Sequence, residues 1–321
     1  MKANVKSAII GIAKIVIIVS IFAIIANNIY SNWEQLKGQK IHFDIFYGIL
    51  SILVMALAWI STSWSWGKTL ELFGFKLGYR DVFVIYFRSM VGKYLPGKFW
   101  QIIGSTYFAS KKGVPEGLTI ASVVIGQVYS LLSGFVLFAA AVVLWGIRVS
   151  PDSILDFRWS SGPVLLFMLV LSFRPGLMIP IMNWFLRLLK REEIQITIGT
   201  SKAIKIFVLF LFPWLIFGLS FWLFACSLTF LPFSQYPLLT SVMVGATVIG
   251  FLAIFAPGGV GVREGLIVIL MPAMTEHSVS FASAVALGYR LITTLVELIA
   301  FGLTWLIRAD HKKLESKLSQ G

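Results

Sequence analysis

The sequence predicts an all-α polytopic membrane protein made of two inverted repeats, each with about three transmembrane helices and one Pro-Gly-broken re-entrant hairpin. Hydrophobic residues make up 58% of the chain and charged residues only 13%, whereas soluble domains carry about 25% charged residues. Several apolar runs reach the ~20 residues that a helix needs to cross a bilayer. Two of these runs are interrupted by Pro-Gly, at matching places in the two halves.

The first half, residues 1–150, is predicted to contain three spans and one interrupted segment. The second span ends in a group of tryptophans, which suits a membrane interface. The interrupted segment is read as a helical hairpin around 81–110, broken at Pro96 and Gly97. The three spans are expected at about 9–28, 45–66 and 118–147.

The second half, residues 151–310, repeats this order, and a cytoplasmic tail follows at 311–321. The run 163–190 is interrupted at Arg174-Pro175-Gly176, and two alternatives stay open: one kinked span, or a short span followed by an interfacial helix. Further spans are expected at about 206–230 and 281–307. The second hairpin lies around 238–274 and is broken at Pro257, Gly258, Gly259 and Gly261.

Proline and glycine explain why both segments are predicted to break. Proline removes a backbone donor and clashes with the preceding turn, and glycine is a poor helix former. Irregular backbone at membrane depth is tolerated only where protein or a water-filled cavity surrounds it. The two interruptions are therefore candidate parts of a substrate site.

A comparison of the chain with itself supports the repeat. A shift of 161 residues places Pro96-Gly97 on Pro257-Gly258, and after a one-residue slip Tyr129 meets Tyr289. Each half would hold three crossings, an odd number, so the second half starts on the opposite side. Inverted repeats with broken helices near the midplane are typical of secondary transporters.

The distribution of basic residues predicts the orientation. Lys and Arg concentrate at the N-terminus, in 67–117, in 174–205 and after Arg308, whereas 231–237 has none. Because cytoplasmic loops carry the excess of Lys and Arg, both termini are predicted to be cytoplasmic, in the cell membrane. The net charge of +13 is explained in this way, and no nucleic-acid partner is expected.

Several charged residues are predicted to lie at membrane depth, where a charge costs about 2.5–3.5 kcal/mol on insertion scales. Arg263 and Glu264 begin a helix after the glycines, where free N–H groups and the helix dipole favour an anion. Glu264 has an alternative role as a helix cap and partner of Arg263. Arg290 and Glu297, seven residues apart, share one helix face. They either bind an anionic headgroup or form buried ion pairs, with each other or with Arg263 and Glu264.

The first half has a different polar set around its interruption, and basic side chains there either bind an anion or reach lipid phosphates. This set is Arg88, Lys93, Tyr94, Lys98, Gln101, Gln127 and Tyr129. The candidate substrate-binding residues of the whole chain are Arg263, Arg290, Arg88, Lys98, Glu264, Glu297, Gln101 and Tyr129.

Soluble-enzyme motifs are absent from the sequence. It has no P-loop, no dinucleotide fingerprint, no HExxH and no GxSxG, and its single cysteine and three histidines show no ligand spacing. The sequence therefore predicts no catalytic residue, no metal, no cofactor and no enzymatic activity.

Two motifs carry a family resemblance. Lys93-Tyr94-Leu95-Pro96-Gly97-Lys98-Phe99-Trp100-Gln101 and the run Pro257 to Gly265 resemble the flippase-like membrane region of lysylphosphatidylglycerol synthases, over about residues 5–310. Many members show an acidic residue or another arginine soon after the first Pro-Gly, where this chain has Lys98 and Gln101. Full-length synthases also carry a soluble aminoacyl-transferase domain; the expectation here is a stand-alone member without it.

The resemblance implies a membrane lipid transporter, flippase or scramblase-like, with membrane lipids of anionic headgroup as partners. Its cargo would be an anionic or modified phospholipid, or a polyprenyl-phosphate-linked glycolipid. Two alternatives stay open. One is an integral-membrane enzyme acting on a lipid phosphate, with Glu264 or Glu297 as general base. The other is a lipid-presenting subunit that works with cell-envelope biosynthesis enzymes.

Overall fold

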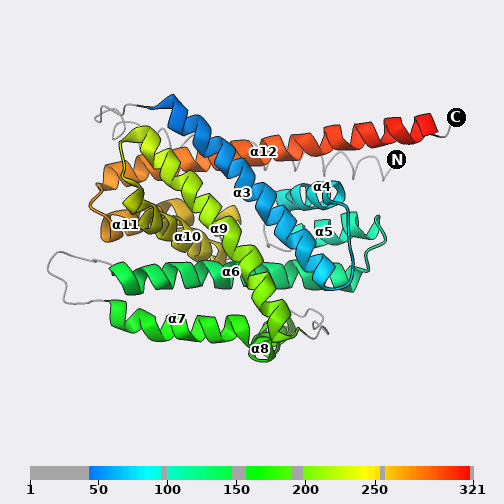
Figure 1. Cartoon of the computed structure of the whole chain (residues 1–321), viewed down its shortest axis with the longest axis horizontal. Coiled ribbons are helices and arrows are strands. Elements are labelled where there is room, and N and C mark those ends of the chain that lie inside the picture. Colours follow the sequence, from blue (N-terminus) through cyan, green and yellow to red (C-terminus); the bar gives the residue numbers. More distant parts are fainter. Residues whose placement is uncertain (1–42, 95–99, 147–156, 189–197, 254–256, 319–321) are drawn as a thin grey trace, which may run out of the picture.

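The computed structural model describes residues 43–94, 100–146, 157–188, 198–253 and 257–318 (Figure 1). These residues form helices and no strands, which confirms the all-α prediction. With η marking a 3-10 helix, the elements are α3 (Ile45–Leu72), α4 (Tyr79–Met90), η1 (Val91–Tyr94), α5 (Trp100–Ser110), α6 (Glu116–Trp145), α7 (Phe157–Phe173), α8 (Pro175–Leu188), α9 (Thr200–Leu228), η2 (Phe233–Gln235), α10 (Tyr236–Leu252), η3 (Pro257–Gly259), α11 (Val262–Met274) and α12 (Val279–Leu318).

Five helices in the described part of the chain are long and apolar enough to cross a membrane: α3, α6, α9, α10 together with η2, and the Val279–Ile307 part of α12. The protein is therefore a polytopic membrane protein. Four of these match predicted spans, and the predicted span 9–28 lies outside the described residues. The fifth, α10, was predicted as one arm of a hairpin rather than as a crossing.

Local chemistry explains where α3 begins and ends. The Asp44 carboxylate accepts hydrogen bonds from the backbone N–H groups of Phe46 and Tyr47, at 2.9 and 3.4 Å, and so satisfies two of the free donors of the first turn. At the other end Lys68 Nζ and Glu71 Oε2 are 2.7 Å apart. This pair, three residues apart on one face, supports the helical turns beyond the predicted end of the span.

The interruption after α7 separates two helices. α7 ends at Phe173 and α8 begins at Pro175, where the missing N–H of proline leaves no bond unmade. Figure 1 shows α7 lying across the view and α8 nearly end-on. Of the two alternatives for 163–190, the structure has the short helix followed by a second helix in a new direction.

The helices pack closely because small side chains stand at their crossings. Ser51 Oγ donates to the carbonyl of Ser220, and Ser220 Oγ donates back to the carbonyl of Ser51, each at 2.8 Å, joining α3 to α9. Gly218 on α9 lies directly against the Thr240 side chain of α10. In a membrane the hydrophobic effect does not drive helices together, so association depends on close packing and on hydrogen bonds between helices. Small residues allow the backbones to approach closely enough for both.

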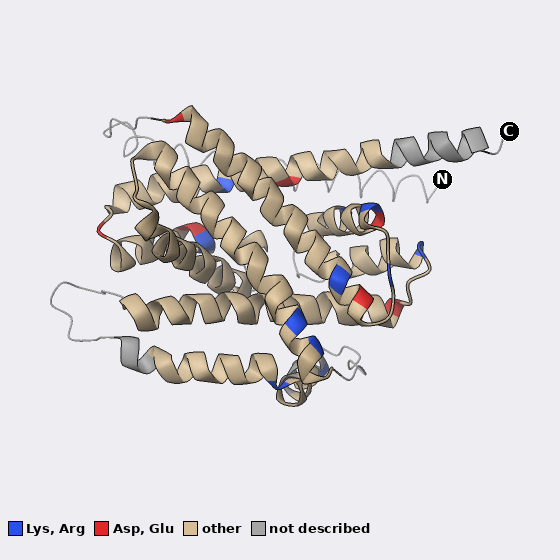
Figure 2. Ribbon diagram, viewed as in Figure 1, with Lys and Arg blue, Asp and Glu red and all other residues tan. Residues whose placement is uncertain are grey.

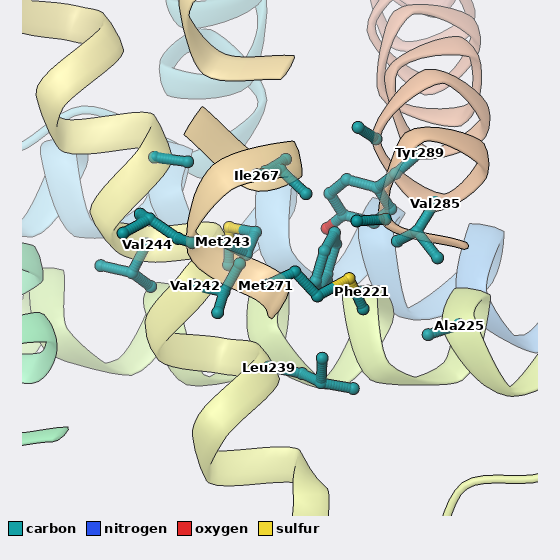
Figure 3. Packing of buried hydrophobic residues seen from close by; sticks show 14 of the residues in the cluster. Phe221, Ala225, Leu239, Val242, Met243, Val244, Ile267, Met271, Val285 and Tyr289 are labelled. Atoms are coloured by element: carbon teal, nitrogen blue, oxygen red, sulfur yellow. The ribbon is translucent and has the colours of Figure 1, made fainter. Parts of the chain in front are cut away.

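The largest apolar cluster holds α10, α11 and α12 against α9 (Figure 3). Met243 of α10, Met271 of α11 and Tyr289 of α12 meet at its centre, each almost fully buried. The Tyr289 hydroxyl donates to the carbonyl of Phe217 on α9 at 3.0 Å. This cluster fixes the position of α11, whose first turn carries Arg263 and Glu264.

Charge is distributed unevenly over the bundle. Figure 2 shows most Lys and Arg bands at the end where α3, α5 and α7 finish and α9 begins. A few bands of both signs also lie on α11 and α12 within the bundle. The basic residues of the charged end include Lys68, Lys76, Arg80, Lys111, Lys112, Arg174, Lys202 and Lys205.

Candidate functional site

The two interrupted segments meet inside the bundle, where η1 lies against η3. Gly258 has a φ of 61°, and a Cβ there would stand 3.2 Å from Tyr94 Cδ1 and 3.7 Å from Arg290 Nη2. Gly259 and Gly261 also have positive φ, 69° and 83°. Only glycine adopts this backbone without strain, so the glycines allow η3 to pass between η1 and α12.

Glu297 of α12 binds η1 through both carboxylate oxygens. Lys93 Nζ donates to Oε1 at 2.6 Å, and the Tyr94 hydroxyl donates to Oε2 at 2.5 Å. Glu297 is only 5% exposed, so both of its acceptors are satisfied away from solvent. Lys93 Nζ also lies 4.9 Å from the centre of the Trp59 ring, within the range of a cation–π contact.

Lys93 and Tyr94 were not among the predicted site residues. The sequence feature that could have identified them is their position directly before Leu95-Pro96-Gly97. A break at membrane depth must be surrounded by protein or by a water-filled cavity, so the residues beside it lie in the interior of the bundle. The partner, Glu297, lies 204 residues from Lys93. A pairing between residues so far apart in the sequence cannot be recognised from a local sequence pattern.

Glu264 caps the first turn of α11, which is the alternative role that the sequence predicted for it. Its Oε2 accepts a hydrogen bond from the Gly261 N–H at 2.7 Å. Its ion-pair partner is Arg290, with Nε 3.7 Å from Oε1, a separation too long for a hydrogen bond. In the described part of the chain no carboxylate pairs with Arg263, whose guanidinium carbon lies 5.5 Å from the centre of the Tyr289 ring. Of the two pairings expected for Glu264, with Arg263 or with Arg290, the structure has the one with Arg290.

Arg290 has unused hydrogen-bond donors. It is 6% exposed, and its Nε and Nη2 find no hydrogen-bond partner among the described residues. The Oε1 atom of Glu264 is likewise buried without a donor. A buried polar atom left unbonded costs about 1–3 kcal/mol, and a charged one more. A ligand that forms hydrogen bonds with these atoms would remove this cost, so its binding free energy would be most favourable here.

The net charge of the cluster is positive. Lys93, Arg263 and Arg290 supply three cations, and Glu264 and Glu297 supply two carboxylates. One further negative charge would neutralise this group. In a low-dielectric interior an uncompensated charge is expensive, so the cluster is suited to an anion of single charge.

Arg88 lies apart from this cluster. Its Nε donates to Thr304 Oγ1 at 3.1 Å and its Nη2 to the Thr304 carbonyl at 2.8 Å. Its guanidinium carbon is 5.2 Å from the centre of the Trp305 ring. Thr304 stands two helical turns beyond Glu297, about 10 Å along α12. Arg88 therefore ties α4 to α12 at a separate level.

Two other predicted residues, Gln101 and Tyr129, are not brought to the cluster. Gln101 lines a pocket between α3, α4, α5 and α6. Tyr129 is fully buried among apolar side chains of α6 and α9, and its hydroxyl has no hydrogen-bond partner in the residues that the structure describes. Lys98, Pro96 and Gly97 lie outside the described residues. No group of three or more His, Cys, Asp or Glu side chains that would hold a metal occurs within the described ranges.

A comparison with known families places the chain. A family model described as the lysylphosphatidylglycerol synthase TM region matches residues 11–300, which includes both interruptions and every residue of the charged cluster. Comparison with curated proteins and with solved structures gives no match. The match relates the protein to the handling of lipids in membranes. The chain therefore belongs to the family of the lysylphosphatidylglycerol synthase transmembrane region.

Proposed function

We propose that this protein is a membrane lipid transporter of flippase or scramblase type, which moves a lipid with an anionic headgroup between leaflets. One observation carries the proposal: Arg290 is buried at the meeting point of η1 and η3, with Nε and Nη2 unbonded in the described structure. A guanidinium offers its N–H groups as a planar fork that matches the oxygens of a phosphate. A lipid phosphodiester also supplies the one negative charge that the cluster needs.

The arrangement of the interrupted segments supports transport. Figure 1 shows α4 and α5 near one end of the bundle and α10 and α11 near the other. We interpret each pair as a re-entrant hairpin and the two halves as inverted repeats. In transporters of this kind, rocking of one repeat against the other exposes a central site to each side in turn. The bonds from Lys93 and Tyr94 to Glu297 join the two halves at this site and would have to change as they move.

The orientation follows from the charged end of the bundle. We assign the end that carries Lys111, Lys112 and Lys202 to the cytoplasmic side of the cell membrane, because cytoplasmic loops hold the excess of basic residues. The α4–α5 hairpin would then enter from the cytoplasm and the α10–α11 hairpin from outside. Cell-envelope biosynthesis enzymes are the expected suppliers or users of the lipid.

Reconstituted protein tests the proposal directly. Liposomes would carry a fluorescent anionic phospholipid, and a membrane-impermeant reductant would bleach the outer leaflet. Vesicles with protein should lose the inner-leaflet signal faster than empty vesicles, and Arg290→Ala should slow this loss. Lys112→Ala, at the basic end of the bundle, is the matched control and should transport normally. Equal rates with and without protein, for every headgroup tried, would refute lipid transport.

One observation favours a second candidate, an enzyme acting on a lipid phosphate. A carboxylate that acts as general base needs a free oxygen within hydrogen-bond reach of the proton that it removes from the substrate or from water. Glu264 Oε1 is buried without a donor among the described residues. Both oxygens of Glu297 are engaged by Lys93 and Tyr94, so Glu264 would be the base. New lipid products formed by purified protein, and lost in Glu264→Gln, would favour this candidate over transport.

A further inference from the structure

A second polar site lies beside the charged cluster, in a pocket between α3, α4, α5 and α6. It encloses a cavity of about 50 Å³, and with the open space at its mouth about 410 Å³. Polar side chains from all four helices contribute to its wall: Thr62, Trp66, Tyr86, Gln101, Ser105, Gln127 and Ser130. None of the described residues that line it is charged. An uncharged polar pocket within a membrane bundle calls for an explanation.

Three polar groups of this pocket have no partner among the described residues. The carboxamides of Gln101 and Gln127 and the hydroxyl of Tyr86 form no hydrogen bond with any residue in the described part of the chain. Thr62 Oγ1 donates to the Ala58 carbonyl at 2.8 Å, which leaves its oxygen free to accept. Each carboxamide adds two donors and one acceptor. Polar groups at membrane depth need partners, and here these must come from a ligand or from water.

The pocket adjoins the charged cluster through the backbone of η1. Gly92 packs so tightly on the start of α5 that a Cβ there would be 2.6 Å from the Gln101 backbone nitrogen. The next two residues, Lys93 and Tyr94, bind Glu297. η1 therefore lies between a positively charged site and an uncharged one.

We propose that this pocket binds the uncharged, ring-shaped polyhydroxyl part of a lipid headgroup, a sugar or a cyclic polyol, while the Arg290 cluster binds the phosphate next to it. The inference rests on the proposed lipid function and narrows its substrate. Each ring hydroxyl both donates and accepts, as the carboxamides and hydroxyls of the wall do. The partly exposed Tyr86 ring supplies apolar surface for the C–H face of such a ring.

The same wall disfavours a charged headgroup extension. An aminoacyl group carries an ammonium, and no carboxylate among the described residues lines the pocket to pair with it. A buried charge without a counter-ion is strongly unfavourable. The pocket therefore selects against aminoacylated phospholipids and in favour of glycosylated or inositol-like ones.

Matched ligands test the proposal in purified full-length protein in detergent. The probes are short-chain phosphatidylinositol and short-chain phosphatidylcyclohexanol, measured by titration calorimetry. Both carry one phosphodiester charge and a six-membered ring, and they differ in the ring hydroxyls. A hydrogen bond to an uncharged group changes affinity by about 2- to 10-fold. The inositol lipid should bind about 10-fold more tightly, and Gln127→Leu should reduce this preference to about 2-fold or less.

Three variants make the result specific. Ser105→Ala should reduce the preference by a smaller factor, and it provides a milder test if Gln127→Leu folds poorly. Gln235→Leu, a glutamine outside the pocket that bonds His277, should keep the full preference. Arg290→Ala should weaken both lipids by the same factor, because it removes the shared phosphate contact.

The outcomes separate this inference from the proposed function. Equal affinity of the wild-type protein for the two lipids, a preference that survives both Gln127→Leu and Ser105→Ala, or tighter binding of short-chain lysyl-phosphatidylglycerol would overturn the pocket assignment and leave a water-filled recess. Translocation in liposomes without any ring preference would keep the function and overturn the inference. A ring preference in detergent without translocation in liposomes would keep the pocket assignment and overturn the transport function. Binding of neither lipid would overturn both.

Discussion

Lys93 and Glu297 form an ion pair of 2.6 Å that joins the 3-10 turn before the first interruption to the middle of the last helix. Tyr94 bonds the second oxygen of the same carboxylate. Because η1 and α12 belong to the two predicted halves, this pair is a direct link between them. It is also a place where a lipid phosphate would compete with Glu297 for a cation.

Breaking this pair from one side should destabilise the protein more than removing both partners. A buried charge left without its partner costs about 3–5 kcal/mol, whereas replacement of the pair by apolar residues is often neutral. We expect Lys93→Met and Glu297→Leu each to lower the unfolding temperature in detergent, and the double variant to lie closer to wild type than either single variant. Additive losses of unfolding free energy would show that the two side chains are not coupled.

The glycine at the junction should not accept a methyl group. Gly258 has a φ of 61° and faces Tyr94, so Gly258→Ala should destabilise the protein by about 1–2 kcal/mol and slow lipid translocation by moving η3 away from Arg290. Gly265 on α11 is the matched control, since its Cβ position is open, and Gly265→Ala should preserve both stability and transport. Equal effects of the two substitutions would contradict a specific requirement at Gly258.

Arg88 should behave as a structural residue rather than as a lipid ligand. It donates two hydrogen bonds to Thr304, and hydrogen bonds from a charged group are worth about 1.5–3 kcal/mol each. We expect Arg88→Ala to lower the unfolding temperature while the folded fraction keeps its lipid affinity. A loss of affinity as large as that of Arg290→Ala, at unchanged stability, would instead make Arg88 a binding residue.

Stability should fall in mildly acidic solution because of His277, in the loop between α11 and α12. Its Nε2 lies 2.8 Å from Gln235 Oε1. Burial lowers the pKa of His277, partly opposed by the neighbouring Glu276. The unfolded chain therefore takes up a proton on this side chain at a higher pH than the folded one, so folding stability is retained above the unfolded pKa of about 6.5 and declines as pH falls below it.

The His277→Asn variant isolates this contribution. Thermal unfolding at a series of pH values from about 7.5 to 5 should show a smaller decline in the variant than in the wild-type protein. Parallel curves would show that other groups cause the acid sensitivity.

The described spans and the break at Pro257 could be predicted from the sequence because their signals are local. An apolar run of about 20 residues specifies a span, and Pro257 with its glycines specifies a break wherever it falls. Glu264 as a cap followed from its position in the first turn of α11. The run after 163 could not be resolved, since the direction of α8 after Arg174 depends on what it packs against.

The partners of the buried charges were decided only by the tertiary structure. Arg263 and Glu264 are adjacent, yet neighbours in a helix point in different directions, and Glu264 pairs with Arg290 instead. Lys93 forms an ion pair with Glu297, and Arg88 donates a hydrogen bond to Thr304. In each case more than half of the chain separates the two residues. The sequence determined that charges enter the membrane. The packing of α4, α11 and α12 determined which of them were neutralised, and it left Nε and Nη2 of Arg290 without a hydrogen bond among the described residues.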